Sequence, residues 1–154
     1  MSMEKELSQG IHNPLVSLQL NILHAEGIDE PNLHPSVGDR SYCVVLWVMP
    51  GREFYTNTVM GMLNPIWNSE GVIFLRNLPD KYTFLYLEVL RLNSVTDPGT
   101  SNGVVVVGRA KIPLPKNVNC KKSGRFGLVR VESGRCKAEG HIILSMELKR
   151  CKNK

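Results

Sequence analysis

The side chains that most often carry out acid–base or covalent chemistry are scattered along this 154-residue chain. The four histidines accompany no nucleophile motif and lie far apart, at His12, His24, His34 and His141. Neither a G-x-S-x-G nucleophile elbow nor an H-E-x-x-H metal motif occurs in the sequence. We therefore expect a protein without enzymatic activity.

The cysteines and the one glycine-spaced segment do not predict a metal or phosphate site either. The cysteines form no C-x-x-C pair and have no histidine at zinc-finger spacing, so we expect reduced thiols at Cys43, Cys120, Cys136 and Cys151. Residues 103–110 have the glycine spacing of a phosphate loop. However, four valines separate the glycines, which indicates a strand, and Arg109 and Ala110 stand where Lys and Ser or Thr are required.

Composition places the chain among globular proteins with anionic partners. Apolar residues make up 42% and charged residues 21%, and 19 Lys and Arg against 14 Asp and Glu give a net charge of +5. Such a balance favours phospholipid head groups, acidic protein surfaces or nucleic acid. Apart from Phe126, the basic residues lack interleaved aromatic side chains, so we expect no nucleic acid partner. No segment approaches the roughly 18 apolar residues of a membrane span, and the polar N-terminus does not predict a signal peptide, so we expect a soluble, cytoplasmic protein.

Alternation of apolar and polar residues with a period of two dominates the chain and predicts β-strands. The expected strands cover residues 16–23, 42–49, 53–59, 66–75, 82–90, 104–112, 126–131 and 140–148. Turn residues separate them about every ten positions and no helix is expected, which is typical of an antiparallel sandwich or barrel. We expect a flexible N-terminal tail over residues 1–13, one domain over residues 14–150 and a basic C-terminal tail over residues 151–154.

Several segments together resemble the C2 domain family. Residues 56–68 read T-N-T-V-M-G-M-L-N-P-I-W-N, which is similar to a signature in which a strand runs into an Asn-Pro-aromatic turn. In such a turn Pro65 ends strand pairing, Asn64 caps the turn and Trp67 fills the space between the sheets. Residues 18–28, 39–44, 86–89 and 107–114 resemble further blocks of the family in the same order. The resemblance implies an all-β fold, an eight-stranded antiparallel β-sandwich of type II topology, as in small single-module plant C2 proteins.

The resemblance also implies where calcium would bind, in loops that bring about five aspartates together to supply six to eight oxygen ligands. Here Asp39 matches one aspartate position and Asp29 matches another loosely. The Asp-x-Asp pair of the third loop is replaced by Arg91 and Asn93, with Asp97 farther along. A guanidinium cannot deprotonate and would oppose a divalent cation. We therefore expect degenerate calcium loops and no cofactor.

Two interpretations of Arg91 remain open at this point. Arg91 either pairs with Asp39 or Asp97 and holds the loops together without a metal, or it points into solvent. An exposed ion pair would contribute only about 0–1 kcal/mol.

The sequence offers two kinds of candidate binding surface. In family members that bind acidic lipids without calcium, lysines on the concave strands do so, but the matching strand here holds one base and one acid. Basic residues gather later instead, in a stretch that includes Arg130, and the predicted lipid- or partner-binding residues are Arg52, Lys111, Lys116, Lys121, Lys122 and Arg125. Apolar side chains near the loop apices could insert into a membrane or cover a partner, although such residues are more often core: Leu33, Met60, Met62 and Leu63.

Two functions therefore stand as hypotheses. The first is a non-enzymatic C2 module for signalling that docks on anionic phospholipid at the inner face of the plasma membrane, independently of calcium. The alternative is a protein–protein interaction adaptor, in plant defence signalling, with little lipid binding. The sequence predicts neither the partner nor the oligomeric state.

Overall fold

The chain forms an all-β structure, represented by a computed structural model that describes residues 15–36, 38–61, 63–76, 82–94, 100 and 102–151. No helix, and hence none able to cross a bilayer, occurs in these ranges. The strands are β1 (Val16–Glu26), β2 (Ser41–Trp47), β3 (Phe54–Tyr55), β4 (Val59–Met60), β5 (Ile66–Leu75), β6 (Phe84–Leu92), β7 (Val105–Pro113), β8 (Lys121–Glu132) and β9 (Arg135–Arg150).

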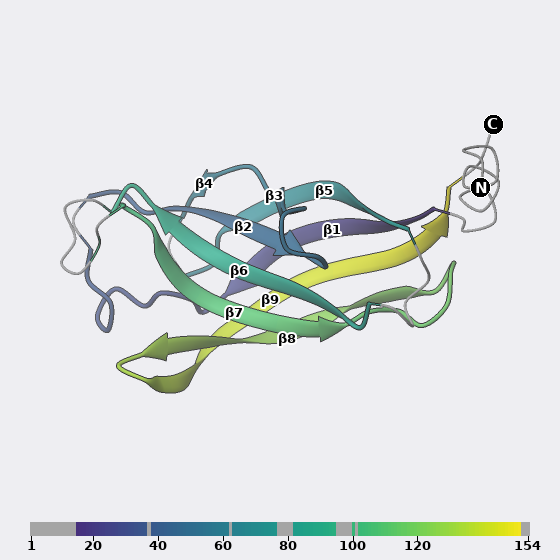
Figure 1. Cartoon of the computed structure of the whole chain (residues 1–154). Helices are drawn as coiled ribbons and strands as arrows, with labels where there is room; N and C mark the ends of the chain where they lie inside the picture. The colour runs from purple at the N-terminus through teal and green to yellow at the C-terminus, as the bar shows by residue number, and fades with distance from the viewer. Residues whose placement is uncertain are drawn as a thin grey trace, which may run out of the picture.

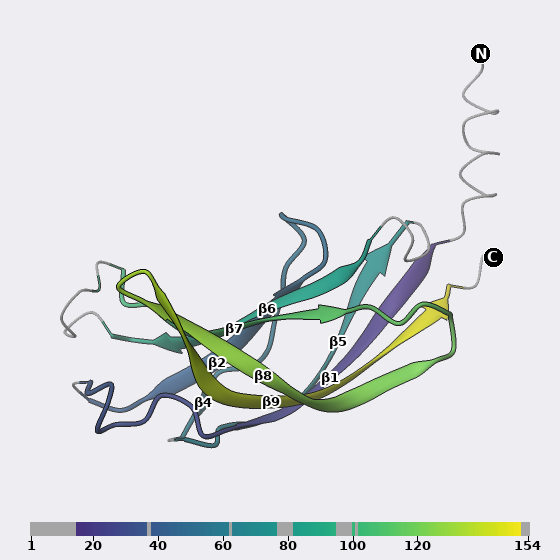
Figure 2. The ribbon, with the colours of Figure 1, turned by 90° about the horizontal axis from the view of Figure 1, so that it is seen from below.

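The strands form two layers, as the sequence predicts for a sandwich of type II topology. Hydrogen-bonded neighbours follow the order β3-β2-β6-β7-β8-β9-β1-β5, with β4 pairing to β2, and the strand pairs are antiparallel. One residue pair, Arg109 with Val129, connects β7 to β8. The path therefore folds over at this point, and β3-β2-β6-β7 lies against β8-β9-β1-β5 (Figure 1, Figure 2).

Apolar side chains from both layers form the core, because every second residue of each strand points inward. Leu18 and Ile22 of β1, Leu46 of β2 and Leu87 of β6 are at most 1% exposed. Trp67 of β5 is also buried, and its indole Nε1 donates to the carbonyl oxygen of Tyr42 at 3.0 Å. This confirms the predicted position of the tryptophan between the sheets.

The Asn-Pro turn before β5 is tied to the end of β1. Asn64 Oδ1 accepts a hydrogen bond from the Gly27 amide at 3.0 Å, and the Pro65 carbonyl accepts one from Ala25. The asparagine side chain thus stabilises the neighbouring strand end, a longer-range contact than the local turn cap predicted from the sequence.

The expected strand 53–59 is divided into β3 and β4 by a side chain that competes with the backbone. Thr56 Oγ1 accepts the hydrogen bond of the Val44 amide at 2.9 Å, a bond that an uninterrupted ladder would give to a carbonyl. The strand count consequently rises to nine in the described chain. β8 and β9 are longer than expected, since Lys121 to Gly124 already pair with β9.

The first described residue lies beside the last. The Cys151 amide donates to the Leu15 carbonyl at 3.0 Å. The expected tail over residues 1–13 and the remainder of the basic tail lie outside the described residues.

Four connections meet at one end of the sandwich, which we call the loop end: the β1–β2 loop, the β4–β5 connection, the β6–β7 connection and the β8–β9 hairpin (left in Figure 1). The β7–β8 connection lies at the opposite end, because β7 starts opposite the end of β6 and runs away from it. The loop end positions the candidate site.

Candidate functional site

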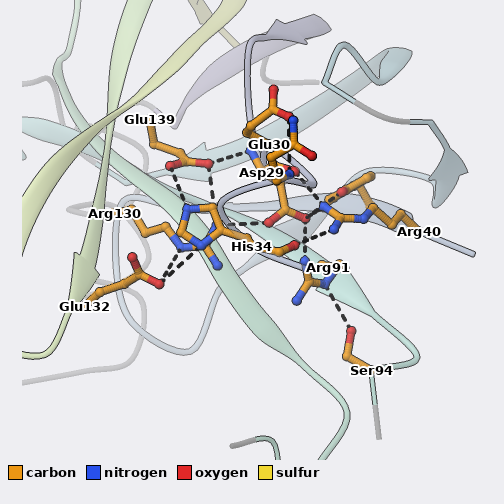
Figure 3. A network of polar contacts seen from close by, with 11 residues as sticks. Asp29, Glu30, His34, Arg40, Arg91, Ser94, Arg130, Glu132 and Glu139 are labelled. Carbon is orange, nitrogen blue, oxygen red and sulfur yellow. Dashed lines mark hydrogen bonds and ion pairs between the residues drawn. The ribbon is translucent and has the colours of Figure 1, made fainter. Parts of the chain in front are cut away.

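A buried carboxylate, Asp29, lies at the centre of the loop end (Figure 3). It follows β1, is 0% exposed and has a positive φ of 54°, a backbone conformation that Asp and Asn adopt more readily than most residues. Its Oδ2 accepts from the Tyr42 hydroxyl at 2.6 Å. Its backbone amide donates to Glu139 Oε2. Both the side chain and the main chain of Asp29 are therefore held in place.

Three arginines from three elements converge on this carboxylate. Arg40, directly before β2, lies 2.9 Å from Oδ2 through Nη1. Arg91, near the end of β6, places its Nη1 2.6 Å from the same oxygen. Arg130 of β8 places its Nη1 2.9 Å from Asp29 Oδ1. The three side chains are only 5–6% exposed. One carboxylate thus links the β1–β2 loop, β6 and β8.

An outer ring of groups balances the arginines. Arg130 Nη1 lies 3.5 Å from Glu139 Oε2, and its Nε lies 3.6 Å from Glu132 Oε2. His34 faces both of these glutamates, with Nδ1 3.3 Å from Glu132 Oε2 and Nε2 4.0 Å from Glu139 Oε1. The buried carboxylates of Asp29 and Glu139 and the part-exposed carboxylate of Glu132 offset the positive charge of the arginines.

The rest of the polar network joins side chains to the backbone. Arg40 also donates to the carbonyl oxygens of Asp29 and His34, and Arg91 Nε donates to Ser94 Oγ at 3.2 Å. No buried side-chain nitrogen or oxygen among the described residues lacks a hydrogen-bond partner. A fully satisfied network of this kind holds loops in one arrangement.

The electrostatic surroundings favour the ionised form of Asp29. Burial alone would raise the pKa of its carboxyl, but hydrogen bonds from Tyr42 and Arg130 and the charge of Arg91 outweigh burial and lower the pKa from 3.8. Burial and the hydrogen bond to Asp29 raise the pKa of Tyr42 to about 12. Asp29 is therefore an anion, and Tyr42 a neutral donor, near pH 7.

The structure places Arg91 inside the protein, which contradicts its interpretation as a side chain in solvent. Of the two expected partners, Asp39 is wrong, and the pair with Asp97 stays a prediction. Asp29, which matched the calcium pattern only loosely, receives the ion pair, whereas Asp39 is exposed and forms no ion pair with the described residues. Asp97 lies outside the described residues. Asn93 has a positive φ of 60° at the end of β6 and is exposed.

The described residues of the loop end do not fit a calcium ion. Calcium needs six to eight oxygen ligands. Both oxygens of Asp29 already accept hydrogen bonds, and three guanidinium groups surround them. The described ranges also contain no group of three His, Cys, Asp or Glu side chains arranged to hold a metal ion. A cation entering beside Asp29 would have to displace arginines.

The predicted basic residues lie elsewhere. Lys111, Lys116 and Lys121 are exposed around the β7–β8 connection, opposite the loop end, and Lys122 donates from Nζ to the Pro113 carbonyl at 2.9 Å. Arg125 is exposed and pairs with Glu26 at 3.0 Å. Two further basic residues do not join this group. Arg52 is exposed at the β2–β3 turn, and Arg130 is buried, which corrects its assignment to the basic surface.

The predicted apolar apices lie at the loop end. Leu33 and Met60 are 73% and 65% exposed, and Met60 pairs with Ser41 beside Arg40. Leu63 is half-buried and bridges to Ile28, whereas Met62 lies outside the described residues. The structure therefore separates the lysines from the apices along the length of the sandwich.

Strand alternation in the sequence indicates that two of the arginines around Asp29 point inward, although they were not predicted to lie beside Asp29. Arg130 falls in phase with the buried Leu128, and Arg91 falls in phase with Leu87 and Val89, so alternation alone points both inward. His34, Arg40 and Glu139 carry no such signal, because loop geometry and a distant hairpin bring them to Asp29.

Comparison with solved structures shows what this arrangement is similar to. The chain superimposes on a C2 domain of plant Extended Synaptotagmin 1 with a TM-score of 0.65 at 17% identity, covering 91% of this chain and 98% of that one. The fold is that of a C2 domain. No family model and no curated protein matches the sequence.

Two other neighbours of this C2 fold are larger proteins. Human GIVD cytosolic phospholipase A2, in complex with methyl γ-linolenyl fluorophosphonate, superimposes with a TM-score of 0.63 at 14% identity over 92% of this chain. This chain spans only 18% of that enzyme. The calcium-bound pair of C2 domains of Extended-Synaptotagmin 2 superimposes with a TM-score of 0.60 at 16% identity, over 95% of this chain and 48% of that one.

Proposed function

We propose that this chain is a non-enzymatic C2 module that docks on anionic phospholipid at the cytoplasmic face of a membrane, without calcium. The C2 fold that it shares with a cytosolic phospholipase A2 and with extended synaptotagmins supports the proposal. The observation that carries it is the group of lysines around the β7–β8 connection.

Charge is distributed unevenly along the chain. The 24 residues from Gly108 to Val131 contain seven Lys and Arg and no Asp or Glu. Arg109, Arg125 and Arg130 have carboxylate partners from other segments. The four lysines of this segment, which we call the connection lysines, form none of the ion pairs found in the described chain: Lys111, Lys116, Lys121 and Lys122.

The expected affinity follows from membrane electrostatics. Each Lys near an anionic leaflet contributes about 1 kcal/mol, so four contribute roughly 4 kcal/mol, or about a thousandfold in partitioning. The attraction is screened over about 10 Å at 0.1 M salt, so binding weakens as salt rises. The connection lysines therefore suit a reversible electrostatic contact.

Calcium independence rests on the loop end. Calcium would supply positive charge and join the loops in a C2 domain that binds it. Here Arg40, Arg91 and Arg130 supply positive charge beside Asp29 and join the loops through side chains. We propose that the loops keep this arrangement with or without the ion.

Vesicle sedimentation with a charge-matched pair of variants tests the proposal. Lys116→Gln with Lys121→Gln removes two charges at the connection, and Arg135→Gln with Lys137→Gln removes two exposed charges at the β8–β9 hairpin. Vesicles of phosphatidylcholine with or without phosphatidylserine are compared at two salt concentrations, in EGTA and in calcium. Both variants have the same net charge, so any difference between them reflects position.

The connection variant should lose roughly 30-fold in partitioning to phosphatidylserine vesicles, and the hairpin variant about threefold or less. Wild-type binding should fall with salt and be equal in EGTA and calcium. Equal losses in the two variants, binding to neutral vesicles, or binding that requires calcium would overturn the proposal.

A protein-interaction adaptor is the second candidate function. A hollow with an aromatic floor on the outer face of β2, β6 and β7 favours it.

A further inference from the structure

The outer face of β2, β6 and β7 carries two rows of cross-strand neighbours. Trp47, Tyr86 and Lys111 form one row, because Trp47 pairs with Tyr86 and Tyr86 pairs with Lys111. The next row, two residues along each strand, contains Glu88 and Arg109 and continues to Val129 of β8. Side chains two residues apart share a face, so all of these point away from the core.

These rows line an open hollow of about 540 Å³ on the outer face of β2, β6 and β7, which β8 borders. Its floor is aromatic and aliphatic. The rings of Trp47 and Tyr86 stack with centroids 5.9 Å apart and an interplanar angle of 19°. Both rings are half-buried, and Val129 is 41% exposed beside them. Rigid, partly exposed aromatic side chains of this kind are enriched at the centres of protein interfaces.

The charged rim of the hollow is largely occupied. Arg109 Nε lies 2.9 Å from Glu88 Oε2, and Lys111 Nζ lies 4.1 Å from the centroid of the Phe84 ring. A phosphate site needs several bases free to converge on one anion. Two bases with one acid leave a rim with a single net positive charge. That balance suits a carboxylate at the edge of an apolar contact better than a phosphorylated head group.

The strand edges beside the hollow are open. β7 pairs with β6 at eight positions but with β8 at one, and β8 pairs with β9 at eleven. On either side of the pair formed by Arg109 and Val129, the facing edges of β7 and β8 diverge. Unpaired backbone groups at a strand edge are a template for a further strand, which a lipid cannot supply.

We propose that this hollow binds an extended segment of a partner protein, aligned along the β7 edge, with a bulky apolar side chain over Trp47 and Tyr86 and acidic side chains beside Arg109 and Lys111. In an extended segment, residues two apart point to the same side. The acidic residues therefore lie two positions before and after the apolar one. This surface shares Lys111 with the lipid contact proposed above, whereas Lys116, Lys121 and Lys122 lie outside the lining of the hollow.

Nuclear magnetic resonance with a defined peptide tests this binding mode. The probe is an acetylated seven-residue peptide with phenylalanine at the centre, valine on each side of it and glutamate elsewhere. In ¹⁵N-labelled protein the two tryptophan indole resonances report separately: Trp47 lies in the hollow, and Trp67 is buried between the sheets. The same peptide with lysine for glutamate, and soluble dihexanoyl-phosphatidylserine, serve as comparison ligands.

The Trp47 indole resonance should shift saturably with the glutamate peptide while that of Trp67 stays in place. The amides of β7 on either side of Arg109 should gain protection from hydrogen exchange. The lysine peptide should bind at least about tenfold more weakly, because like charges then meet at the rim.

Two valines at similar exposure provide matched variants. Val129→Asp lies in the hollow, and Val72→Asp lies on β5, where Val72 is 43% exposed. Only Val129→Asp should abolish the shift. Absence of a Trp47 shift up to about 5 mM peptide, equal binding of the two peptides, or a shift with phosphatidylserine alone would overturn the proposal. Loss of lipid sedimentation would leave this result unaffected, so the two proposals fail independently.

Discussion

Replacing Asp29 by Asn removes the charge on which three buried arginines converge. Asn has nearly the same shape and tolerates the positive φ of 54°, so the variant keeps the backbone and changes mainly the electrostatics. The guanidinium groups of Arg40, Arg91 and Arg130 then share fewer negative partners in a site that solvent does not reach. Removing one partner of a buried ion pair costs about 3–5 kcal/mol.

For a domain of this size, each kcal/mol of lost stability lowers the melting temperature by about 2–4 °C. The melting temperature of Asp29→Asn should therefore fall by roughly 6–20 °C. Urea unfolding followed by tryptophan fluorescence measures the free energy, since Trp67 is buried in the folded state. Asp39→Asn is the matched control, because Asp39 is exposed in the same loop. The control should change stability by about 0.5 kcal/mol or less. A loss for Asp29→Asn within about 1 kcal/mol of the control would refute the reasoning.

The effect of pH has a definite sign. The folded-state pKa of Asp29 is lowered from 3.8, because donors from Tyr42 and Arg130 and the charge of Arg91 outweigh its burial. The unfolded chain therefore binds a proton more readily. The stability that Asp29 contributes is fully present above its ordinary pKa and is lost as pH falls through the folded value. The difference between wild type and Asp29→Asn should stay constant from pH 7 to about pH 5 and shrink below about pH 4.

Three further predictions concern groups around the core. Ultraviolet titration should show one tyrosine ionising near pH 12, and Tyr42→Phe, which removes it, should cost about 1.5–3 kcal/mol in urea unfolding because a donor to a buried anion is lost. Gly140→Ala should be more destabilising than Gly134→Ala in the same assay: both have positive φ, which costs about 1–3 kcal/mol, but only at Gly140 would the new Cβ lie 2.1 Å from a carbonyl oxygen at the end of β1. Burial raises the pKa of the Cys43 thiol, so at pH 8 it should react with a disulfide reagent far more slowly than the exposed Cys136.

The two-layer fold could be predicted because it depends on patterns that are local in sequence. Alternation located the strands, and residues 66–75 coincide with β5. The Asn-Pro-x-Trp segment indicated the C2 fold, and Trp67 lies between the sheets as expected. The division of residues 53–59 depended on Thr56, whose hydroxyl takes a backbone hydrogen bond. Nothing in the strand pattern reveals that competition.

The cluster at the loop end could be predicted only in part. The sequence showed that Arg91 replaces an expected aspartate and suggested that it pairs with a carboxylate. It did not identify Asp29 as the partner, because the contact joins residues 62 positions apart across a loop with irregular backbone. Arg130 is 101 positions from Asp29 in the sequence. Its place in the alternation of β8 indicates a side chain that points inward, but its charge favoured an exposed position.

Calorimetric titration of calcium into the protein tests the central claim most directly. If Arg40, Arg91 and Arg130 neutralise Asp29 in place of a calcium ion, titration of calcium should produce no saturable heat in the micromolar range. It should also leave the melting temperature unchanged. Saturable micromolar calcium binding, with a matching rise in melting temperature, would contradict the account.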